Sequence, residues 1–145
     1  MLAAATHSSG TFAANALCVA AALATIRELE KPGFYENLEA KGNKIINGVQ
    51  EICKKYGMKC YTRAVGGLWT VLFGTDEPIH DYRDHYKKVD KVTYRKLVQG
   101  CMENGIRLNP WRGRNYVNPA TTDEDIEYSL KVFDELLGKI IAGEM

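Results

Sequence analysis

The feature that most constrains this chain is a nearly continuous apolar run over residues 15–29, NALCVAAALATIREL. Alanine is the best helix former, so the run predicts a helix, and Pro32 and Gly33 predict that it ends before them. A helix that is apolar on all sides is buried on most of them. A chain of 145 residues is expected to form one domain with a core of its own, but such a helix needs more protein around it than a small domain supplies. We therefore expect this helix to be covered at an interface.

The next stretch predicts a second helix followed by a hairpin. Apolar or small residues recur at steps of three and four, which is typical of one helix face, and Gly57 predicts the end: Leu38, Gly42, Ile45, Val49, Ile52 and Tyr56. Two runs rich in β-formers, MKCYTRA and LWTVLF, then flank Gly66 and Gly67. Trp69, Val71 and Phe73 are expected on one side of this hairpin.

The second half of the chain predicts two helices and two short strands. The charged stretch TDEPIHDYRDHYKKVDK is expected to be a loop or a solvated excursion, and residues 94–104 a helix. IRLNP and NYVNP are expected to be short edge strands, where proline is tolerated. Thr122 is the expected N-cap of a last amphipathic helix. This order predicts an α+β fold, with a small antiparallel sheet covered on one face by helices.

Composition limits the partners and the compartment. The net charge of +1 gives no electrostatic reason to bind nucleic acid or an anionic membrane. Arg27 and Glu28 interrupt the apolar run too soon for a membrane span, and residues 1–5 lack the basic start of a signal peptide. We expect a cytoplasmic protein.

The four cysteines are Cys18, Cys53, Cys60 and Cys101, and none forms a C-x-x-C pair. Cys18 and Cys53 occupy apolar helical positions, where a thiol behaves as a small hydrophobic group. A disulfide between Cys53 and Cys60 is conceivable, but buried free thiols are the interpretation that fits a cytosolic chain.

Three stretches could carry chemistry. His80, His85 and the aspartates between them have the atoms of a metal site but no helical frame, so a solvated loop is favoured and no metal is expected. The WRGR stretch ends at Arg114, whose planar guanidinium suits a carboxylate or phosphate; the alternative is a surface loop. No catalytic serine, histidine and carboxylate set can be assigned.

The turn before the apolar helix is the third stretch. Gly10 allows close approach of the backbone, Thr11 offers a hydroxyl, and free N–H groups at a helix start attract anions. A simple helix cap explains the same residues equally well.

Taken in order, five segments resemble the C-terminal part of class III (subgroup II) aminotransferases, which depend on pyridoxal phosphate: SGTFAANALCVAAALATIREL, VGGLWTVLF, FGTDEPIHDYRD, GIRLNP and RGRNYVNPATTDEDIE. The resemblance implies the C-terminal domain of a type I pyridoxal-phosphate enzyme fold. Residues 1–32 would form the phosphate turn and interface helix, and residues 33–145 the small domain. It also implies that Gly10 and Thr11, assisted by Ser9, bind the cofactor phosphate of a partner subunit, and that Arg114 holds the substrate carboxylate.

In that family the lysine that bonds the cofactor lies before the Gly-Thr turn, so the resemblance implies that this chain lacks it. We expect the chain alone to be inactive and not to bind pyridoxal phosphate by itself. Its partner would be a second copy or a separate large-domain chain, and the complete enzyme would act on a small amino-acid-like substrate. The alternative is a free-standing, non-catalytic remnant that oligomerises or binds a ligand.

Overall fold

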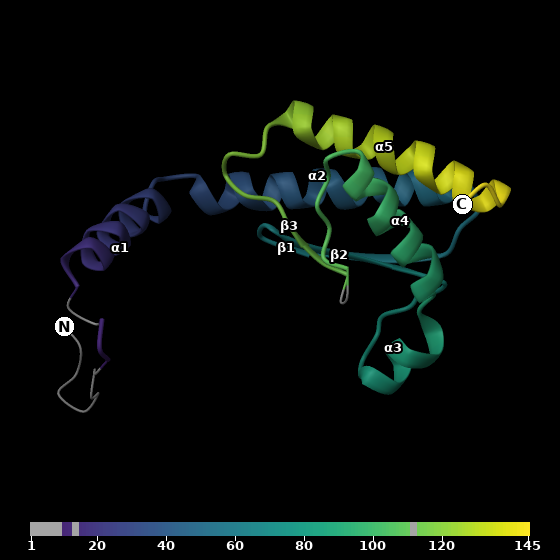
Figure 1. Cartoon of the computed structure of the whole chain (residues 1–145), viewed down its shortest axis with the longest axis horizontal. Helices are drawn as coiled ribbons and strands as arrows, with labels where there is room; N and C mark the ends of the chain where they lie inside the picture. The colour runs from purple at the N-terminus through teal and green to yellow at the C-terminus, as the bar shows by residue number, and fades with distance from the viewer. Residues whose placement is uncertain (1–9, 13–14, 111–112) are drawn as a thin grey trace. The chain divides into compact units, whose positions relative to one another are not determined.

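The structure, a computed structural model, describes residues 10–12, 15–110 and 113–145. The chain divides into two compact units, Met1–Phe34 and Tyr35–Met145, and each is described by itself (Figure 1).

The first unit contains helix α1, Ala16–Leu29. Its N-cap is Asn15, whose side-chain oxygen accepts hydrogen bonds from the backbone N–H groups of Leu17 and Cys18, both at 3.1 Å. The predicted helix is confirmed. However, none of its residues is buried, and Leu17 is 79% exposed. The described residues of this unit therefore do not supply the burial expected for an all-apolar helix.

The second unit is built on a three-stranded antiparallel sheet in the order β1 (Cys60–Val65), β2 (Leu68–Phe73), β3 (Arg114–Tyr116). The predicted hairpin is confirmed: Val65 pairs with Leu68 across a two-residue turn, and Gly66 has a φ of +55°. That left-handed backbone conformation is one that glycine adopts without steric cost. Among the described residues, the short β3 pairs with Leu68–Thr70 of β2, and β1 pairs with β2 along its whole length.

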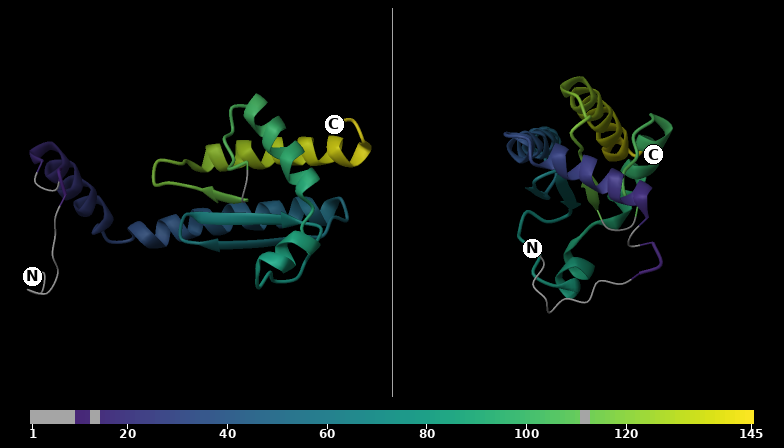
Figure 2. Two further views of the ribbon diagram at one scale, coloured as in Figure 1. Left: turned by 60° about the horizontal axis from the view of Figure 1, so that its bottom comes forward. Right: turned by 90° about the vertical axis from the view of Figure 1, so that its left-hand side faces the viewer.

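Helices α2 (Phe34–Lys55), α4 (Lys91–Glu103) and α5 (Asp123–Ala142) pack against one face of the sheet (Figures 1 and 2). Trp69, Val71 and Phe73 point into this core, as expected from strand alternation. Ion pairs from Lys44 to Asp123 and from Lys55 to Asp134 join α2 to α5, which run in the same direction. The predicted α+β architecture is confirmed.

Helix α5 begins where the sequence predicts. The Thr122 hydroxyl accepts from the Asp125 N–H at 3.1 Å, and the Asp125 carboxylate accepts from the Thr122 N–H at 2.9 Å. This reciprocal pair is a capping box, which satisfies two backbone donors at once.

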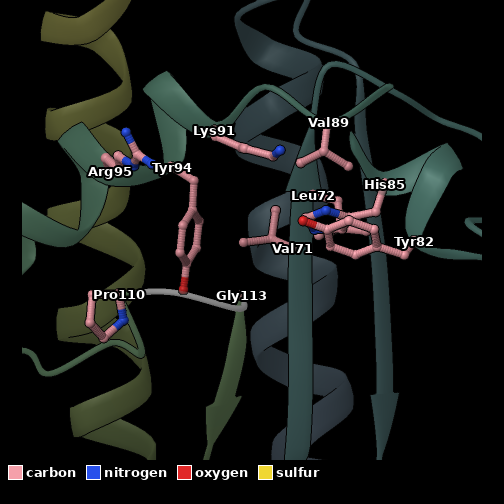
Figure 3. Close-up of a pocket in the computed structure, with 10 residues that line it drawn as sticks. All are labelled: Val71, Leu72, Tyr82, His85, Val89, Lys91, Tyr94, Arg95, Pro110 and Gly113. Atoms are coloured by element: carbon pink, nitrogen blue, oxygen red, sulfur yellow. The ribbon is translucent and has the colours of Figure 1, made fainter. Parts of the chain in front are cut away.

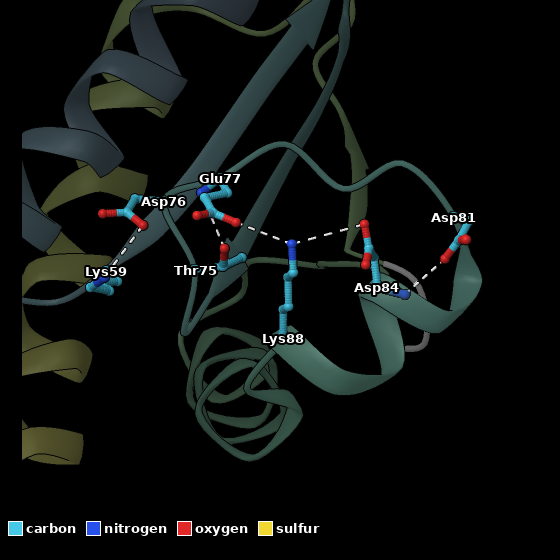
Figure 4. Close-up of polar contacts among 7 residues, drawn as sticks. All are labelled: Lys59, Thr75, Asp76, Glu77, Asp81, Asp84 and Lys88. Carbon is cyan, nitrogen blue, oxygen red and sulfur yellow. Dashed lines mark hydrogen bonds and ion pairs between the residues drawn. The ribbon is translucent and has the colours of Figure 1, made fainter.

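The charged stretch 75–91 is not only a loop, so that prediction is wrong in part. It contains a short helix, α3 (Tyr82–Lys88), because the Asp81 side chain caps it by accepting from the Asp84 N–H at 2.8 Å. Lys88 then forms ion pairs with Glu77 at 3.1 Å and with Asp84 at 3.9 Å (Figure 4). Local side-chain bonds stabilise this helix where hydrophobic periodicity gives no signal.

Two further predictions need correction. IRLNP, residues 106–110, is not a strand, although Leu108 is buried in the core. The helix predicted to start at Tyr94 begins three residues earlier, at Lys91, because Asp90 caps it by accepting from the Val92 and Thr93 N–H groups.

All four cysteines are free. Cys53 and Cys101 are buried as predicted, and burial raises the pKa of Cys101 to about 12. A hydrogen bond with Cys60 and burial raise the pKa of Cys53. The prediction for Cys18 is wrong, because this thiol is exposed on α1. None of the described helices combines the length and the apolar character needed to cross a bilayer.

Candidate functional site

The sheet face opposite the helices carries the candidate site in the second unit. Arg63 on β1, Thr70 on β2 and Arg114 on β3 are direct cross-strand neighbours. Because directly paired residues of antiparallel strands project from the same face, their side chains form one row. Neighbouring strands lie about 4.8 Å apart, so the two arginine Cα atoms are roughly 10 Å apart.

This row is positively charged and exposed. Neither Arg63 nor Arg114 has an ion pair or side-chain hydrogen bond to any described residue, and both are exposed. Val65, Leu68 and Trp69 line the same shallow hollow. Two guanidiniums beside apolar walls suit an anion with an apolar part, and arginine can bind a carboxylate through two parallel hydrogen bonds.

Asn115 fixes the chain segment that leads into Arg114. Its side chain is 3% exposed and accepts hydrogen bonds from the Asn109 N–H at 2.9 Å and the Tyr94 hydroxyl at 3.3 Å. It also donates to the Gly113 carbonyl at 3.3 Å. Because the amide is buried and satisfied, it holds the start of β3 in one position.

The predicted phosphate turn belongs to the first unit. Gly10 and Thr11 are exposed, and Thr11 lies in a turn. Helix α1 begins only at Ala16, and Asn15 already occupies two of its first N–H groups. The N–H groups of Leu17 and Cys18 are therefore not available to an anion at the turn. Ser9 lies outside the described residues, as do Trp111 and Arg112 of the WRGR stretch.

No described lysine is buried. Hydrogen bonds to Asp123, Asp134 and Glu77 raise the pKa values of Lys44, Lys55 and Lys88 respectively. A lysine that attacks a carbonyl needs the opposite shift, which requires loss of solvent or a neighbouring cation. None of these three lysines has the environment of a covalent nucleophile.

The HDYRDH stretch does not gather ligands for a metal ion. Across the described ranges, no three histidine, cysteine, aspartate or glutamate side chains are placed to hold one. Asp81 and Asp84 instead cap and stabilise α3.

Comparison with proteins of known name finds aminomutases that match most of this chain, although no family model does. The chain is 32% identical over 132 residues, 90% of its length, to a glutamate-1-semialdehyde 2,1-aminomutase of Desulfitobacterium hafniense strain Y51. It is 30% identical over 135 residues to the enzyme of the same name from Desulfatibacillum aliphaticivorans.

Solved structures agree with this match. A glutamate-1-semialdehyde aminomutase from Pseudomonas aeruginosa PAO1 superposes with a TM-score of 0.80 and 22% identity, over 91% of this chain and 29% of that one. An omega-transaminase from Sphaerobacter thermophilus gives a TM-score of 0.79 and 21% identity, over 92% of this chain and 30% of that one. The chain resembles class III pyridoxal-phosphate-dependent aminotransferases.

The predicted aminotransferase resemblance is therefore confirmed, and it concerns one part of those enzymes. The chain spans about 30% of the length of the aminomutases that it matches. Other structural relatives include a transaminase with pyridoxal phosphate bound and an aminomutase in complex with pyridoxamine phosphate. At 20% and 22% identity, these two structures support the aminotransferase fold of this chain.

Two residues of the site were missed by sequence reasoning. The two-residue turn at Gly66 and Gly67 fixes the hairpin register, and counting back from it places Arg63 opposite Thr70. That signal was present in the sequence. For Asn115 no comparable signal exists, because its partners Tyr94 and Asn109 come from a helix and a loop whose approach depends on the tertiary fold.

Proposed function

We propose that this chain supplies the small domain of a pyridoxal-phosphate-dependent aminotransferase or aminomutase, which moves an amino group on an amino acid or amino aldehyde. The supporting observation is the match over 90% of the chain to aminomutases of known name, together with a shared fold. Residues 33–145 form this small domain in the proposal. Residues 1–32 contribute the phosphate turn and the interface helix in this proposal.

Arg114 binds the substrate carboxylate in this proposal. Its position favours the role, since it is exposed, has no ion pair to a described residue and starts a strand that Asn115 holds in place. Arg63, two strands away on the same face, adds a second positive charge that attracts the anionic substrate.

Gly10 and Thr11, assisted by Ser9, hold the cofactor phosphate in this proposal. The turn fits an anion in its chemistry: no hydrogen bond joins the Thr11 hydroxyl or its backbone N–H to another described residue, and Gly10 has no Cβ to keep a phosphate at a distance. When bound, pyridoxal phosphate supplies the electron sink for amino-group transfer. The residues of this chain contribute phosphate binding and substrate orientation.

The lysine that bonds the cofactor comes from another segment or another chain in this proposal. The described lysines are solvated, and three have ion pairs that favour the charged form. The chain alone is then inactive and does not retain the cofactor. We place the assembly in the cytoplasm, which the four free cysteines favour.

Helix α1 provides the contact surface for the missing part. Leu17, Val19, Leu23 and Ile26 are all exposed on it. An apolar helix with no buried residue favours coverage by a partner. The same observation favours a second candidate, in which two copies of a non-catalytic chain cover each other through α1.

Reconstitution tests the proposal. The full chain is co-expressed with a polypeptide that carries the remaining, unmatched part of the Desulfitobacterium aminomutase, and the purified mixture is assayed for amino-group transfer. We expect a stable complex and activity only when both chains are present, with activity reduced by Thr11→Ala and by Arg114→Gln. If the chain instead forms a homodimer that ignores the added polypeptide, the non-catalytic alternative is correct.

A further inference from the structure

A second cavity, of about 180 Å³, lies in the unit formed by Tyr35–Met145 and has no role in the proposed function. It lies beside Val71 and Leu72 of β2, just beyond Leu68–Thr70, the part of this strand that pairs with β3. Helix α3 and the first turn of α4 close around this part of β2, together with Pro110 and Gly113 (Figure 3).

The walls of the cavity are apolar and aromatic. Val71, Leu72 and Val89 contribute aliphatic groups, and the rings of Tyr82 and Tyr94 stand on either side of this part of β2 (Figure 3). The Tyr94 hydroxyl already donates to the Asn109 carbonyl at 2.7 Å, so this residue presents its ring rather than its polar atom. A dry cavity of about 150 Å³ admits a benzene ring, so this one has room for a single ring with a small substituent.

The polar groups of the cavity are basic. Lys91 and Arg95 of α4 line it, and no aspartate or glutamate is among its described lining residues. His85 Nδ1 is buried and has no hydrogen-bond partner in the described part of the chain. Burial and the nearby Lys91 ammonium lower the pKa of His85, so the imidazole is neutral at pH 7. One neutral tautomer carries a proton on Nδ1, which can then donate to an acceptor.

We propose that this cavity binds a small monocarboxylate with an apolar body, about the size of benzoate. The ring lies between the tyrosine rings and the aliphatic side chains of β2, and the carboxylate lies against Lys91 and Arg95 and accepts from His85 Nδ1. The ligand satisfies the buried imidazole nitrogen and neutralises a group of cations that has no acidic neighbour among the lining residues. This site does not depend on the cofactor or on the proposed activity.

Titration of the full chain with sodium benzoate, followed by two-dimensional NMR, tests the proposal. We expect saturable shifts at Val71, Val89 and His85 with a Kd of about 1 mM, the strength that a ligand of this size commonly reaches. Benzyl alcohol, which has the same ring and no charge, should bind at least about fivefold more weakly. Nuclear Overhauser effects from the benzoate ring should reach the methyl groups of Leu72 and Val89.

Single substitutions test whether benzoate binding depends on the cations that line the cavity or on any positive charge of the chain. Lys91→Gln and Arg95→Gln should each weaken benzoate binding by about fivefold, whereas Lys54→Gln on the exposed side of α2 should leave it unchanged. Absence of saturable shifts, equal binding of benzyl alcohol, or ring contacts outside the cavity would each overturn the proposal. The ring contacts are measured on the wild-type chain, so they remain decisive if a variant fails to fold.

Discussion

Gly42 offers a sharp test of the packing in the second unit. It is buried in α2, and a methyl group added at its Cα would overlap the backbone carbonyl oxygen of Gly66 in the hairpin turn. That oxygen belongs to the main chain and cannot rotate away as a side chain would. Gly42→Ala should therefore separate the helix from the turn.

The sign of the effect distinguishes packing from helix propensity. In an exposed helix interior, replacing glycine by alanine stabilises by about 0.5–1 kcal/mol. Overpacking at a close backbone contact costs about 1–3 kcal/mol. We expect the second effect to be larger, so that Gly42→Ala lowers the free energy of unfolding by about 1–2 kcal/mol and the Tm by roughly 3–8 °C.

Urea unfolding followed by far-ultraviolet circular dichroism measures this difference, with Asn43→Ala as the matched control. Asn43 is the next residue of α2 and is exposed, so its replacement tests propensity alone and should stabilise the chain by a few tenths of a kcal/mol. If Gly42→Ala stabilised the chain as much as the control does, the close approach of α2 to the hairpin would be incorrect.

Three further predictions follow from single contacts. Asn115→Ala should lower the free energy of unfolding by about 2–3 kcal/mol in urea, because it leaves the half-buried Asn109 N–H and the buried Tyr94 hydroxyl with one acceptor fewer; an effect below about 0.5 kcal/mol would contradict this. Burial opposes ionisation of Asp90, but hydrogen bonds from Thr93 and Val92 outweigh it and lower the pKa of Asp90 below 3.8. This stabilisation is complete above about pH 4 and is lost as the pH falls through the lowered pKa, so Asp90→Asn, which keeps the cap oxygen, should lose less stability than wild type between about pH 5 and 2. Iodoacetamide should modify Cys18 rapidly and Cys101 only on unfolding, as peptide mass spectrometry of the native chain would show.

The sequence predicts those parts of the fold that depend on local signals. Gly66 and Gly67 identify the hairpin, and Thr122 followed by acidic residues identifies the start of α5. Periodicity gives the buried face of α2, including Ile45 and Val49. In each case the local preference of the sequence agrees with the final packing, so the element can be predicted without knowing the tertiary structure.

The failures occur where tertiary contacts or short side-chain bonds decide. Helix α3 has seven residues and no buried one, so its only signal is the Asp81 cap. IRLNP reads as a strand because Leu108 is apolar, yet Leu108 is buried within a loop that Asn115 holds. The apolar sequence of α1 predicts a buried Cys18, but the described residues of its own unit leave this thiol exposed.

The central claim is that this chain contributes phosphate and substrate contacts to a pyridoxal-phosphate enzyme whose covalent lysine lies elsewhere. Borohydride reduction of the reconstituted mixture in the presence of pyridoxal phosphate, followed by peptide mass spectrometry, tests it most directly. We predict one reduced pyridoxyl group per complex, on a lysine of the added polypeptide and on none of this chain. A stoichiometric pyridoxyl group on a single lysine of this chain would contradict the account.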